Sequence, residues 1–455
     1  MRRKIYIILG WIFAWQVLSW LVNNPILLAG PLETGKALLD NIVMPSFWKT
    51  VSYSLLRIAA GFFAGVGVGL VLACARARFP PSSSQEGLKL PISEASSFFS
   101  PVLSLIKAVP VASFVVLFLI WWHSDMLSTA ISFCVVLPNI YISTLEGIRS
   151  TDHRLLEMAQ VFRWSPRDRF FYIYRPALKP FLDSSIKVSV GLGWKSGVAA
   201  EVIGTPAFSI GERLYMSKIY LETADVLAWT AVTIALSVLS EKALLWAWER
   251  FCKWEPDCRG AGMSDLSCKP QQKALRLEHV CKSYGGQQIL NDFCAAYDRG
   301  STTYFTTPSG SGKTTLFRMI AGLEKPDAGE ISCGGSVAMV FQEDRLCEEY
   351  SALKNVEMIT GDRNRAREHL LCLLEEGDIT RPCKELSGGM KRRVAIARAF
   401  ASQSDILLLD EPFTGLDQDT MQRVQCYMEQ YRKERTLLIA THIGQNVQTV
   451  ERCGD

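Results

Sequence analysis

The sequence predicts an α-helical membrane bundle of about six spans followed by a soluble α/β domain. In the first half of the 455-residue chain, several long and nearly charge-free stretches reach the ~20 residues needed to cross a bilayer. The second half alternates strand-like runs with helical ones, an order typical of a largely parallel sheet. Because the chain is also too long for one ordinary core, we expect more than one domain.

Hydropathy places the six predicted spans at approximate positions 5–22, 51–74, 98–122, 126–148, 183–205 and 226–248. The first follows a basic N-terminus, but no small-x-small cleavage site follows it, so we interpret it as a retained helix and not a signal peptide. The third contains Lys107 and Pro110, and Pro110 predicts that its membrane helix begins only near that residue.

Charge in the loops predicts the orientation of the spans. Segment 149–179 is rich in Arg and Lys, and Arg2, Arg3 and Lys4 precede the first span, so the positive-inside rule places both in the cytoplasm. The loops after Val22 and Gly204 have balanced charge, as outward-facing segments do. We therefore expect a multi-pass protein in the lipid of the cytoplasmic membrane, with its soluble domain in the cytoplasm.

Composition sets the domain boundaries and excludes several classes. We expect a transmembrane domain over 1–252, a linker over 253–272, where the apolar period is lost, and a second domain over 273–455. A net charge of +4 without a basic cluster in the soluble domain argues against nucleic acid as a partner. Thirteen cysteines without a CxxC pair and five scattered histidines favour reduced thiols over disulfides or a zinc site.

A phosphate-binding loop opens the second domain. The run from Tyr304 to Thr315 reads YFTTPSGSGKTT and passes from a strand through a Gly-rich loop into a helix. Backbone N–H groups there would converge on the β-phosphate, Lys313 would reach the β and γ oxygens, and Thr314 would ligate Mg²⁺. The residues that we assign to nucleotide binding in this loop are Pro308, Ser309, Gly310, Ser311, Gly312, Lys313, Thr314 and Thr315.

Thr307 stands where the usual loop pattern has its first glycine. A residue before proline is pushed toward extended geometry, so a β-branched residue fits at this position without the strain of a positive φ. We therefore expect nucleotide binding to be retained.

The apolar strand from Ile406 ends in the carboxylates Asp410 and Glu411. In this position Asp410 would hold the Mg²⁺ shell, and Glu411 would orient or deprotonate the attacking water. Acidic residues also end ordinary strands at a sheet edge, so this assignment depends on the phosphate-binding loop.

With these motifs the second domain resembles an ATP-binding cassette of the ABC transporter superfamily. Leu386-Ser387-Gly388-Gly389-Met390 resembles its signature segment, with Met390 in place of the usual glutamine. The resemblance implies that Ser387, Gly388 and Gly389 close on the γ-phosphate held by a second cassette in a head-to-tail dimer. ATP and Mg²⁺ are the cofactors it implies.

The same resemblance implies roles for three further residues. Gln342 would contact Mg²⁺ and water, His442 would contact the γ-phosphate, and Tyr284 would stack on adenine. The alternatives are a polar strand end for Gln342 and a structural histidine for His442.

The basic loop with Glu157-Met158-Ala159 and Ile173-Tyr174-Arg175-Pro176 resembles the coupling motif of importer permeases. It departs from that motif at Arg163, where a glycine is expected, and at Arg175, where a leucine is expected. We expect a short helix whose apolar Ala159, Val161 and Phe162 enter a groove on the cassette.

The stretch from Trp48 to Trp248 resembles permeases of the nitrate, sulfonate and taurine importer family. This implies an extracytoplasmic solute-binding protein as a partner. Lys195 and Glu201 are candidates for the solute path, because an ionisable group in an apolar span normally faces a cavity or a partner. The alternative is that Lys195 snorkels and Glu201 lies near the outer boundary.

The sequence therefore predicts ATP hydrolysis coupled to import of a small solute, a nitrate-, sulfonate- or taurine-like anion or a small organic nutrient. The working unit would be two copies of the chain, or this chain with a similar fusion. Two alternatives stay open. One is an exporter, although the long cytoplasmic helices of that class are not visible, and the other is a non-hydrolysing regulatory membrane protein, suggested by Thr307 and Met390.

Overall fold

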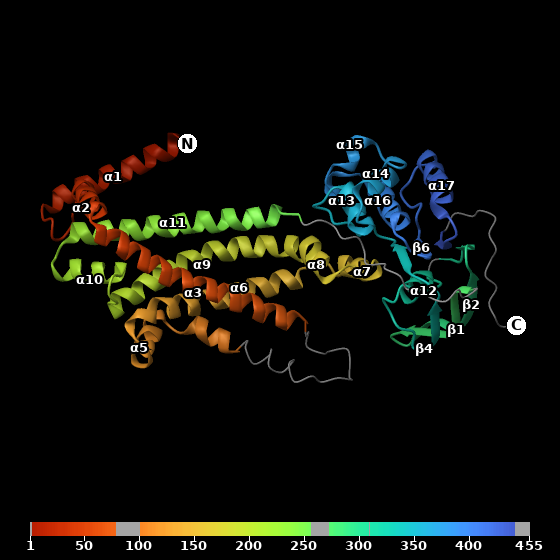
Figure 1. The fold of residues 1–455 in the computed structure, drawn as a ribbon, viewed down its shortest axis with the longest axis horizontal. Coiled ribbons are helices and arrows are strands. Elements are labelled where there is room, and N and C mark those ends of the chain that lie inside the picture. Colours follow the sequence, from red (N-terminus) through yellow and green to blue (C-terminus); the bar gives the residue numbers. More distant parts are fainter. Residues whose placement is uncertain (1, 79–100, 256–272, 309, 442–455) are drawn as a thin grey trace. The chain divides into compact units, whose positions relative to one another are not determined.

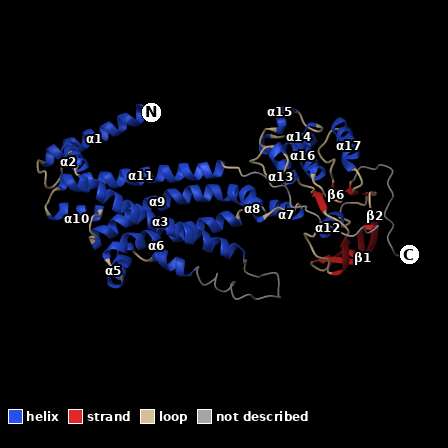
Figure 2. Ribbon diagram, in the orientation of Figure 1, coloured by secondary structure: helices blue, strands red, loops and turns tan. Residues whose placement is uncertain are grey.

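The computed structural model describes residues 2–78, 101–255, 273–308 and 310–441 (Figure 1). The chain divides into two compact units, of which the first comprises Met1–Ser150 and Ala177–Trp254 and the second comprises Thr151–Pro176 and Glu255–Asp455. In the described residues every strand belongs to the second unit (Figure 2). The loop between the fourth and fifth predicted spans therefore packs as part of the cassette unit.

The first unit is a helical bundle, and the described part of each of the six predicted spans lies mainly on helical segments. Its helices are α1 Arg2–Val22, α2 Pro31–Val43, α3 Pro45–Arg78, α5 Val111–Trp121, α6 Leu127–Arg149, α9 Arg175–Gly204, α10 Ile210–Ile219 and α11 Thr223–Lys253, with a 3₁₀ turn, η1, over Ser124–Met126. Among the described residues, three helices are long and apolar enough to cross a membrane, or four if a bent pair counts as one span. Helix α9 is long enough but contains four lysine or acidic side chains between Lys179 and Lys195.

The third predicted span is not one straight helix. Helix Pro101–Ala108 meets α5 at 103°, with the break at Val109 and Pro110. Proline lacks the amide hydrogen that the helix needs and pushes its preceding residue out of the helical region, so both effects act at this break. A helix begins directly after Pro110, as expected, but the continuous span over 98–122 is corrected to a sharply bent pair in its described part, 101–121.

Glycines on α3 let α6 approach closely. A Cβ at Gly61 would lie 2.2 Å from the carbonyl oxygen of Thr129, and Cβ atoms at Gly65 and Gly69 would be within about 3.2 Å of α6. These glycines are four residues apart and therefore form one stripe on α3. Small-residue stripes of this kind allow close helix packing in membranes, where apolar contact alone gives little drive to associate.

The second unit contains two sheets and their surrounding helices. The antiparallel sheet has the order β2-β1-β4, and the parallel sheet has the order β3-β7-β6-β5. The strands are β1 Lys273–Tyr284, β2 Gln287–Asp298, β3 Thr302–Phe305, β4 Ala328–Cys333, β5 Val337–Val340, β6 Ile406–Asp410 and β7 Thr436–Ala440. Strands β6 and β7 are buried at every residue, which explains their unbroken apolar sequence and confirms the predicted α/β domain.

The helices of the second unit include three segments from the loop between the spans. These are α7 His153–Val161, α8 Pro166–Arg169 and the π-helical η2 Phe170–Tyr174. The others are α12 Lys313–Ile320, α13 Ala352–Thr360, α14 Arg363–Leu371, α15 Glu376–Ile379, η3 Cys383–Glu385, α16 Gly388–Ala401 and α17 Gln418–Arg432.

Helix α7 ends in a left-handed turn at Arg163. The amide of Arg163 donates to the carbonyl of Gln160 at 3.0 Å, and that of Trp164 donates to Ala159 at 2.8 Å, which is the Schellman pattern. Arg163 has a φ of 51°, a conformation that glycine adopts without strain. Arg163 thus occupies the glycine position of the coupling motif and adopts a glycine's backbone geometry.

Replacing Arg163 with glycine is expected to stabilise the chain by about 1 kcal/mol, because the relief of left-handed strain exceeds the added freedom of the unfolded chain. The matched control is Arg167→Gly, which removes another exposed arginine from α8, a helical site where glycine costs stability. Thermal unfolding should shift up for the first variant and down for the second. A downward shift for both would contradict the assignment of strain to Arg163.

Candidate functional site

The predicted phosphate-binding loop connects β3 to α12. Gly310 and Gly312 have φ values of 84° and 87°, and a Cβ at Gly312 would lie 2.8 Å from the side chain of Ile289, so both positions require glycine. Thr307 has no positive φ, as its position before Pro308 predicted. The substitution of the usual first glycine therefore leaves the backbone of the loop unstrained at Thr307.

Lys313 lies at the first position of α12 and is buried. Its Nζ donates to the carbonyl oxygens of Thr307 and Pro308, the latter at 3.2 Å. The hydroxyls of Thr307 and Ser311 also bond to each other at 2.7 Å. The ammonium thus lies against the loop at a helix N-terminus, a place where backbone N–H groups and the helix dipole favour an anion such as phosphate.

Asp410 lies at the carboxyl end of β6 with 2% of its surface exposed, and burial raises the pKa of this carboxyl while a hydrogen bond with Thr314 lowers it. Within the described residues its Oδ2 atom has no hydrogen-bond partner. A buried carboxylate oxygen left unpaired beside a threonine hydroxyl and a phosphate loop fits Mg²⁺, which binds one or two carboxylates together with substrate phosphates. Asp410 and Thr314 are thus the residues that would hold the metal.

Glu411 follows Asp410 with a φ of 51°. Its amide donates to the carbonyl of Ala440 at 2.9 Å, and its Oε2 accepts a bond from Thr414 at 3.2 Å. A non-glycine residue with positive φ is strained, and such strain persists where surrounding bonds fix it. The backbone therefore turns sharply at the predicted catalytic carboxylate.

The predicted signature segment begins α16. Ser387 caps this helix and accepts a bond from the amide of Met390 at 3.3 Å, so the cap uses the backbone at position 390 and not its side chain. Ser387 and Gly388 are exposed. Helix α16 packs on α13, α14, α17 and β5, whereas α12 packs on β4 and β6.

Arg392 connects α16 to the segment that follows β5. Its guanidinium is buried and donates to the carbonyl oxygens of Phe341, at 2.6 Å, and Gln342. The side chain of Gln342 is exposed. The signature helix thus fixes the backbone of the residue predicted to contact Mg²⁺ and water.

Tyr284 ends β1 and is 46% exposed beside a turn made by Gly285 and Gly286. Its hydroxyl donates to Glu324, and burial together with that carboxylate raises the pKa of Tyr284. The accessible ring is compatible with the predicted stacking on adenine. Thr315 in α12 and Gly389 in α16 are half-buried, and the other two predicted site residues, Ser309 and His442, lie outside the described residues.

Residues 151–176, called the docking segment below, include Glu157, which is bound by two arginines from the rest of the second unit. Its side chain is only 12% exposed. Arg318 of α12 donates to both carboxylate oxygens, at 2.8 and 2.9 Å, and Arg345, which follows β5, donates at 2.6 Å. These contacts, led by the bond with Arg318, lower the pKa of Glu157 to about 2.

Apolar side chains complete the docking contact. Ala159, Val161 and Phe162 are at most 5% exposed and belong to one hydrophobic cluster with the cassette core, which confirms the predicted groove. Tyr172 packs edge-on against Tyr350 with ring centroids 5.4 Å apart. The Tyr350 hydroxyl accepts a bond from Arg175 at 3.2 Å. Arg175 therefore has a specific buried partner at the position where the motif has leucine.

A chain of bonds connects Tyr284 to the docking segment. Glu324 accepts the Tyr284 hydroxyl and also a bond from Arg318 Nε at 2.6 Å, while the other end of the Arg318 guanidinium holds Glu157. Motif reading assigned no role to Arg318, Glu324 or Arg345. Glu157 was the residue in the sequence that could have indicated such partners, because a carboxylate that enters a groove on a protein needs cations beside it.

The two solute-path candidates on α9 differ in burial. Glu201 is fully buried, and its Oε2 accepts bonds from Ser54 of α3 at 2.8 Å and from the amide of Gly211 in α10 at 3.3 Å. It therefore connects three helices and does not lie at an exposed boundary. Lys195 is exposed on a stripe that includes the apolar residues Val188, Leu192, Ala199 and Ile203 and, two turns before Lys195, a second exposed lysine, Lys187.

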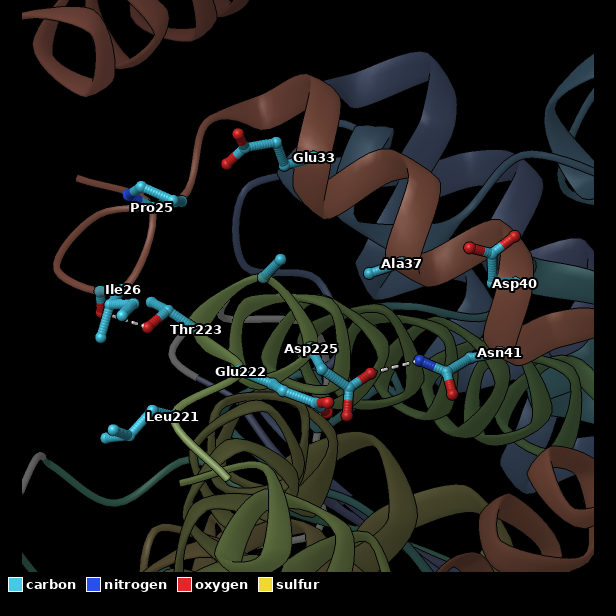
Figure 3. A pocket seen from close by; sticks show the side chains of 11 residues that line it. Pro25, Ile26, Glu33, Ala37, Asp40, Asn41, Leu221, Glu222, Thr223 and Asp225 are labelled. Carbon is cyan, nitrogen blue, oxygen red and sulfur yellow. Dashed lines mark hydrogen bonds between the residues drawn. The ribbon is translucent and has the colours of Figure 1, made fainter. Parts of the chain in front are cut away.

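A cavity of about 460 Å³ lies between the α1–α2 connection, α2 and the α10–α11 turn (Figure 3). Asp225 accepts a bond from Asn41, and Thr223 donates to the carbonyl of Ile26, so these contacts join its two sides. Its charged lining residues are all acidic, namely Glu33, Asp40, Glu222 and Asp225. This charge disfavours an anion in the cavity.

Comparison with known families matches both halves of the chain. A family model described as "ABC transporter" matches residues 290–414. A second, described as "Binding-protein-dependent transport system inner membrane component", matches residues 93–242.

Among curated relatives, the aliphatic sulfonates import ATP-binding protein SsuB 1 of Rhodococcus jostii is 41% identical over 37% of this chain and 72% of its own length. The sulfate/thiosulfate import ATP-binding protein CysA of Synechococcus elongatus is 34% identical over 38% of this chain and 57% of the relative. The Fe(3+) ions import ATP-binding protein FbpC 1 of Rhodococcus jostii is 40% identical, and the chain spans about half of its length, 47%. A solved structure titled "Structure of ATP binding subunit of ABC transporter" is 27% identical, with a TM-score of 0.35 over 37% of this chain and 80% of its own.

Glu157→Gln is expected to loosen segment 151–176, because the neutral amide removes the carboxylate that pairs with Arg345 and one of the two that pair with Arg318, at a cost of roughly 3 kcal/mol. Hydrogen exchange of the α7 amides in the purified chain should become faster by at least tenfold. The control Glu343→Gln removes an exposed ion pair with Arg154, 3.0 Å long, and should leave that exchange nearly unchanged.

Lowering the pH should also loosen segment 151–176 in the wild-type chain, because it protonates Glu157. The folded-state pKa of Glu157 is lower than its ordinary value, so its contribution is complete above about pH 4.5 and is lost as pH falls toward 2. Equal α7 exchange in Glu157→Gln and wild type at pH 7 would contradict both expectations.

Proposed function

Because this chain belongs to the ABC transporter family and joins a binding-protein-dependent permease component to its ATPase, we propose that it imports a small anion, of the sulfonate, nitrate or taurine kind, across the cytoplasmic membrane. A solute-binding protein outside the membrane would deliver the anion. Binding and hydrolysis of ATP with Mg²⁺ would drive the transport.

The observation that supports import over export is the docking of segment 151–176. This short segment from between two membrane helices packs into the cassette core, and a two-arginine contact holds Glu157. The same arginine, Arg318, lies on the helix that begins with Lys313. A change in nucleotide at the loop therefore has a short physical route to the permease through α12.

The proposed working unit contains two cassettes. Ser387 and Gly388 begin an exposed helix N-terminus on the helical part of the unit, whereas Lys313 begins α12 beside the sheets. A helix N-terminus is suited to bind phosphate, and an exposed one is available to a partner. We therefore assign the signature of one copy, or of a similar fusion, to the phosphate loop of the other.

Hydrolysis follows from the residues at the loop and the parallel sheet edge. Lys313 would turn from the carbonyls of Thr307 and Pro308 to the β and γ oxygens. Mg²⁺ held by Asp410 and Thr314 would neutralise charge on the phosphates. Glu411 would orient the attacking water in line with the bond from the γ-phosphorus to the bridging oxygen. Gln342 and His442 complete the proposed set, at the water and at the γ-phosphate.

Lys195 supports an anion as the solute. It is exposed on α9, as is Lys187 two turns earlier, and an ammonium in an apolar span requires a counter-charge or water. Two copies facing one another across the path would present two ammonium groups. Two of the three relatives named above are import proteins for sulfur oxyanions, and the third is one for iron, so the cassette alone does not select the solute.

The coupling test measures ATP hydrolysis by the chain in proteoliposomes, with candidate solute-binding proteins that are loaded with a sulfonate, nitrate or a pyrimidine. We expect one loaded protein to stimulate wild type and to have no effect on Glu411→Gln, whose turnover should fall at least 100-fold because the water is no longer oriented. Turnover indifferent to every binding protein would favour an exporter. Absence of wild-type turnover would favour a regulatory role.

The solute test compares Lys195→Met with Lys218→Met, which removes an exposed lysine from α10 outside the stripe. With the anion-loaded binding protein, Lys195→Met should lower the stimulated rate at least tenfold, and Lys218→Met should stay within about twofold, because only Lys195 lies in the apolar span. Equal rates in the two variants would exclude Lys195 from the path while leaving the importer assignment intact.

A further inference from the structure

The β1–β2 hairpin brings together four metal-ligating side chains on one face. Val280 of β1 lies opposite Phe293 of β2. The neighbours of Val280 are His279 and Cys281, and those of Phe293 are Asp292 and Cys294. Val280 is buried and Phe293 packs against the hydrophobic cluster, so the alternation of a strand turns the four flanking side chains to the opposite face. His279 and Asp292 are exposed, and the two cysteines are half-buried.

Two bulges shape this face. The strand register shifts on either side of Val280, and His279 and Asp292 adopt left-handed φ values of 51° and 49° there. Gly329 of β4 accommodates the first bulge, since a Cβ at that glycine would lie 2.2 Å from the carbonyl oxygen of His279. The bulges place His279 Nδ1 2.7 Å from Asp292 Oδ1 and 3.8 Å from Cys294 Sγ.

These atoms fit the coordination shell of a small divalent ion. The imidazole nitrogen, the carboxylate oxygen and the Cys294 sulfur all lie within 4.8 Å of one another. A tetrahedral Zn²⁺ with bonds of 2.0–2.3 Å places its ligand atoms about 3.5 Å apart, so small side-chain rotations suffice. Cys281 Sγ accepts the amide of Asp292 at 3.3 Å and thereby fixes the backbone of one ligand.

We propose that His279, Asp292 and Cys294 form a transition-metal site for Zn²⁺ or a similar thiolate-binding ion, with solvent at the fourth position. This site is separate from the Mg²⁺ site at Asp410. Sulfur and imidazole ligands favour such ions, whereas Mg²⁺ prefers an all-oxygen shell. Because β1 continues from His279 to Tyr284, the ion would stiffen the strand that presents the adenine-stacking ring.

The chemistry of binding is a proton exchange. The Cys294 thiol loses its proton to solvent as the sulfur–metal bond forms. The proton that His279 Nδ1 donates to the Asp292 carboxylate also leaves to solvent while Nε2 takes up or keeps a proton, so the neutral imidazole binds the ion through Nδ1 and the carboxylate binds it through Oδ1. No oxidant is required. The proposal does not depend on the transported solute or on the working unit.

The test is a Co²⁺ titration of the purified full-length chain after removal of metal, with a phosphine reductant and without nucleotide. Cobalt bound to thiolate gives a charge-transfer absorption, so the readout is independent of ATPase activity. We expect one equivalent per chain, displaced by Zn²⁺. Cys294→Ser should abolish the absorption. His279→Asn keeps a residue that tolerates the left-handed backbone and should weaken Co²⁺ binding at least tenfold.

The control is Cys426→Ser, which removes an exposed cysteine on α17 and should leave the titration unchanged. Thermal unfolding of each metal-free variant checks that the fold is intact. An absorption of wild-type size and affinity in Cys294→Ser, or unchanged affinity in His279→Asn, would overturn the proposed site. Absence of a cobalt absorption in wild type would overturn it as well.

Discussion

The contact of Glu157 with Arg318 and Arg345 is the constraint that holds segment 151–176 to the rest of the second unit. A carboxylate with 12% exposure is expensive to bury unless cations replace its water, so the docking segment and its two arginines form one unit energetically. Arg318 lies on α12, which begins at the phosphate loop, and Arg345 follows Gln342 by three residues. One side chain of the loop between the spans therefore contacts both the helix that begins at the phosphate loop and the segment that follows Gln342.

The parallel sheet likewise brings the predicted nucleotide-site residues together. Parallel strands deliver their carboxyl ends to one edge, which brings Asp410 and Glu411 to the edge where β3 enters the phosphate loop. Buried arginines then fix the connecting segments by donating to backbone carbonyls. Arg392 holds Phe341 and Gln342, and burial lowers the pKa of Arg398, which donates to Asp344 and Arg345, to about 10.

The features that the sequence predicted correctly are those that depend on neighbouring residues in the chain. The apolar run of β6, the glycines of the phosphate loop and the break at Pro110 each follow from properties of adjacent residues. The sequence did not predict partners joined through space, because Arg318 and Glu157 are 161 residues apart. For the same reason the scattered histidines and cysteines argued against a metal cluster, although the pairing of β1 with β2 places His279 beside Asp292 and Cys294. The predicted helical path through 98–122 failed because hydropathy reports burial in lipid and not direction.

Two departures from family glycines show why a motif can change without loss of its geometry. Thr307 precedes Pro308, which favours an extended backbone, so no positive φ is needed there. Arg163 does adopt the left-handed conformation, and its strain persists because two backbone hydrogen bonds and the buried neighbours Phe162 and Trp164 fix the turn from both sides. The surrounding structure therefore determines whether a residue that replaces a family glycine is strained. Thr307 avoids a positive φ, whereas Arg163, at the end of a packed helix, keeps one.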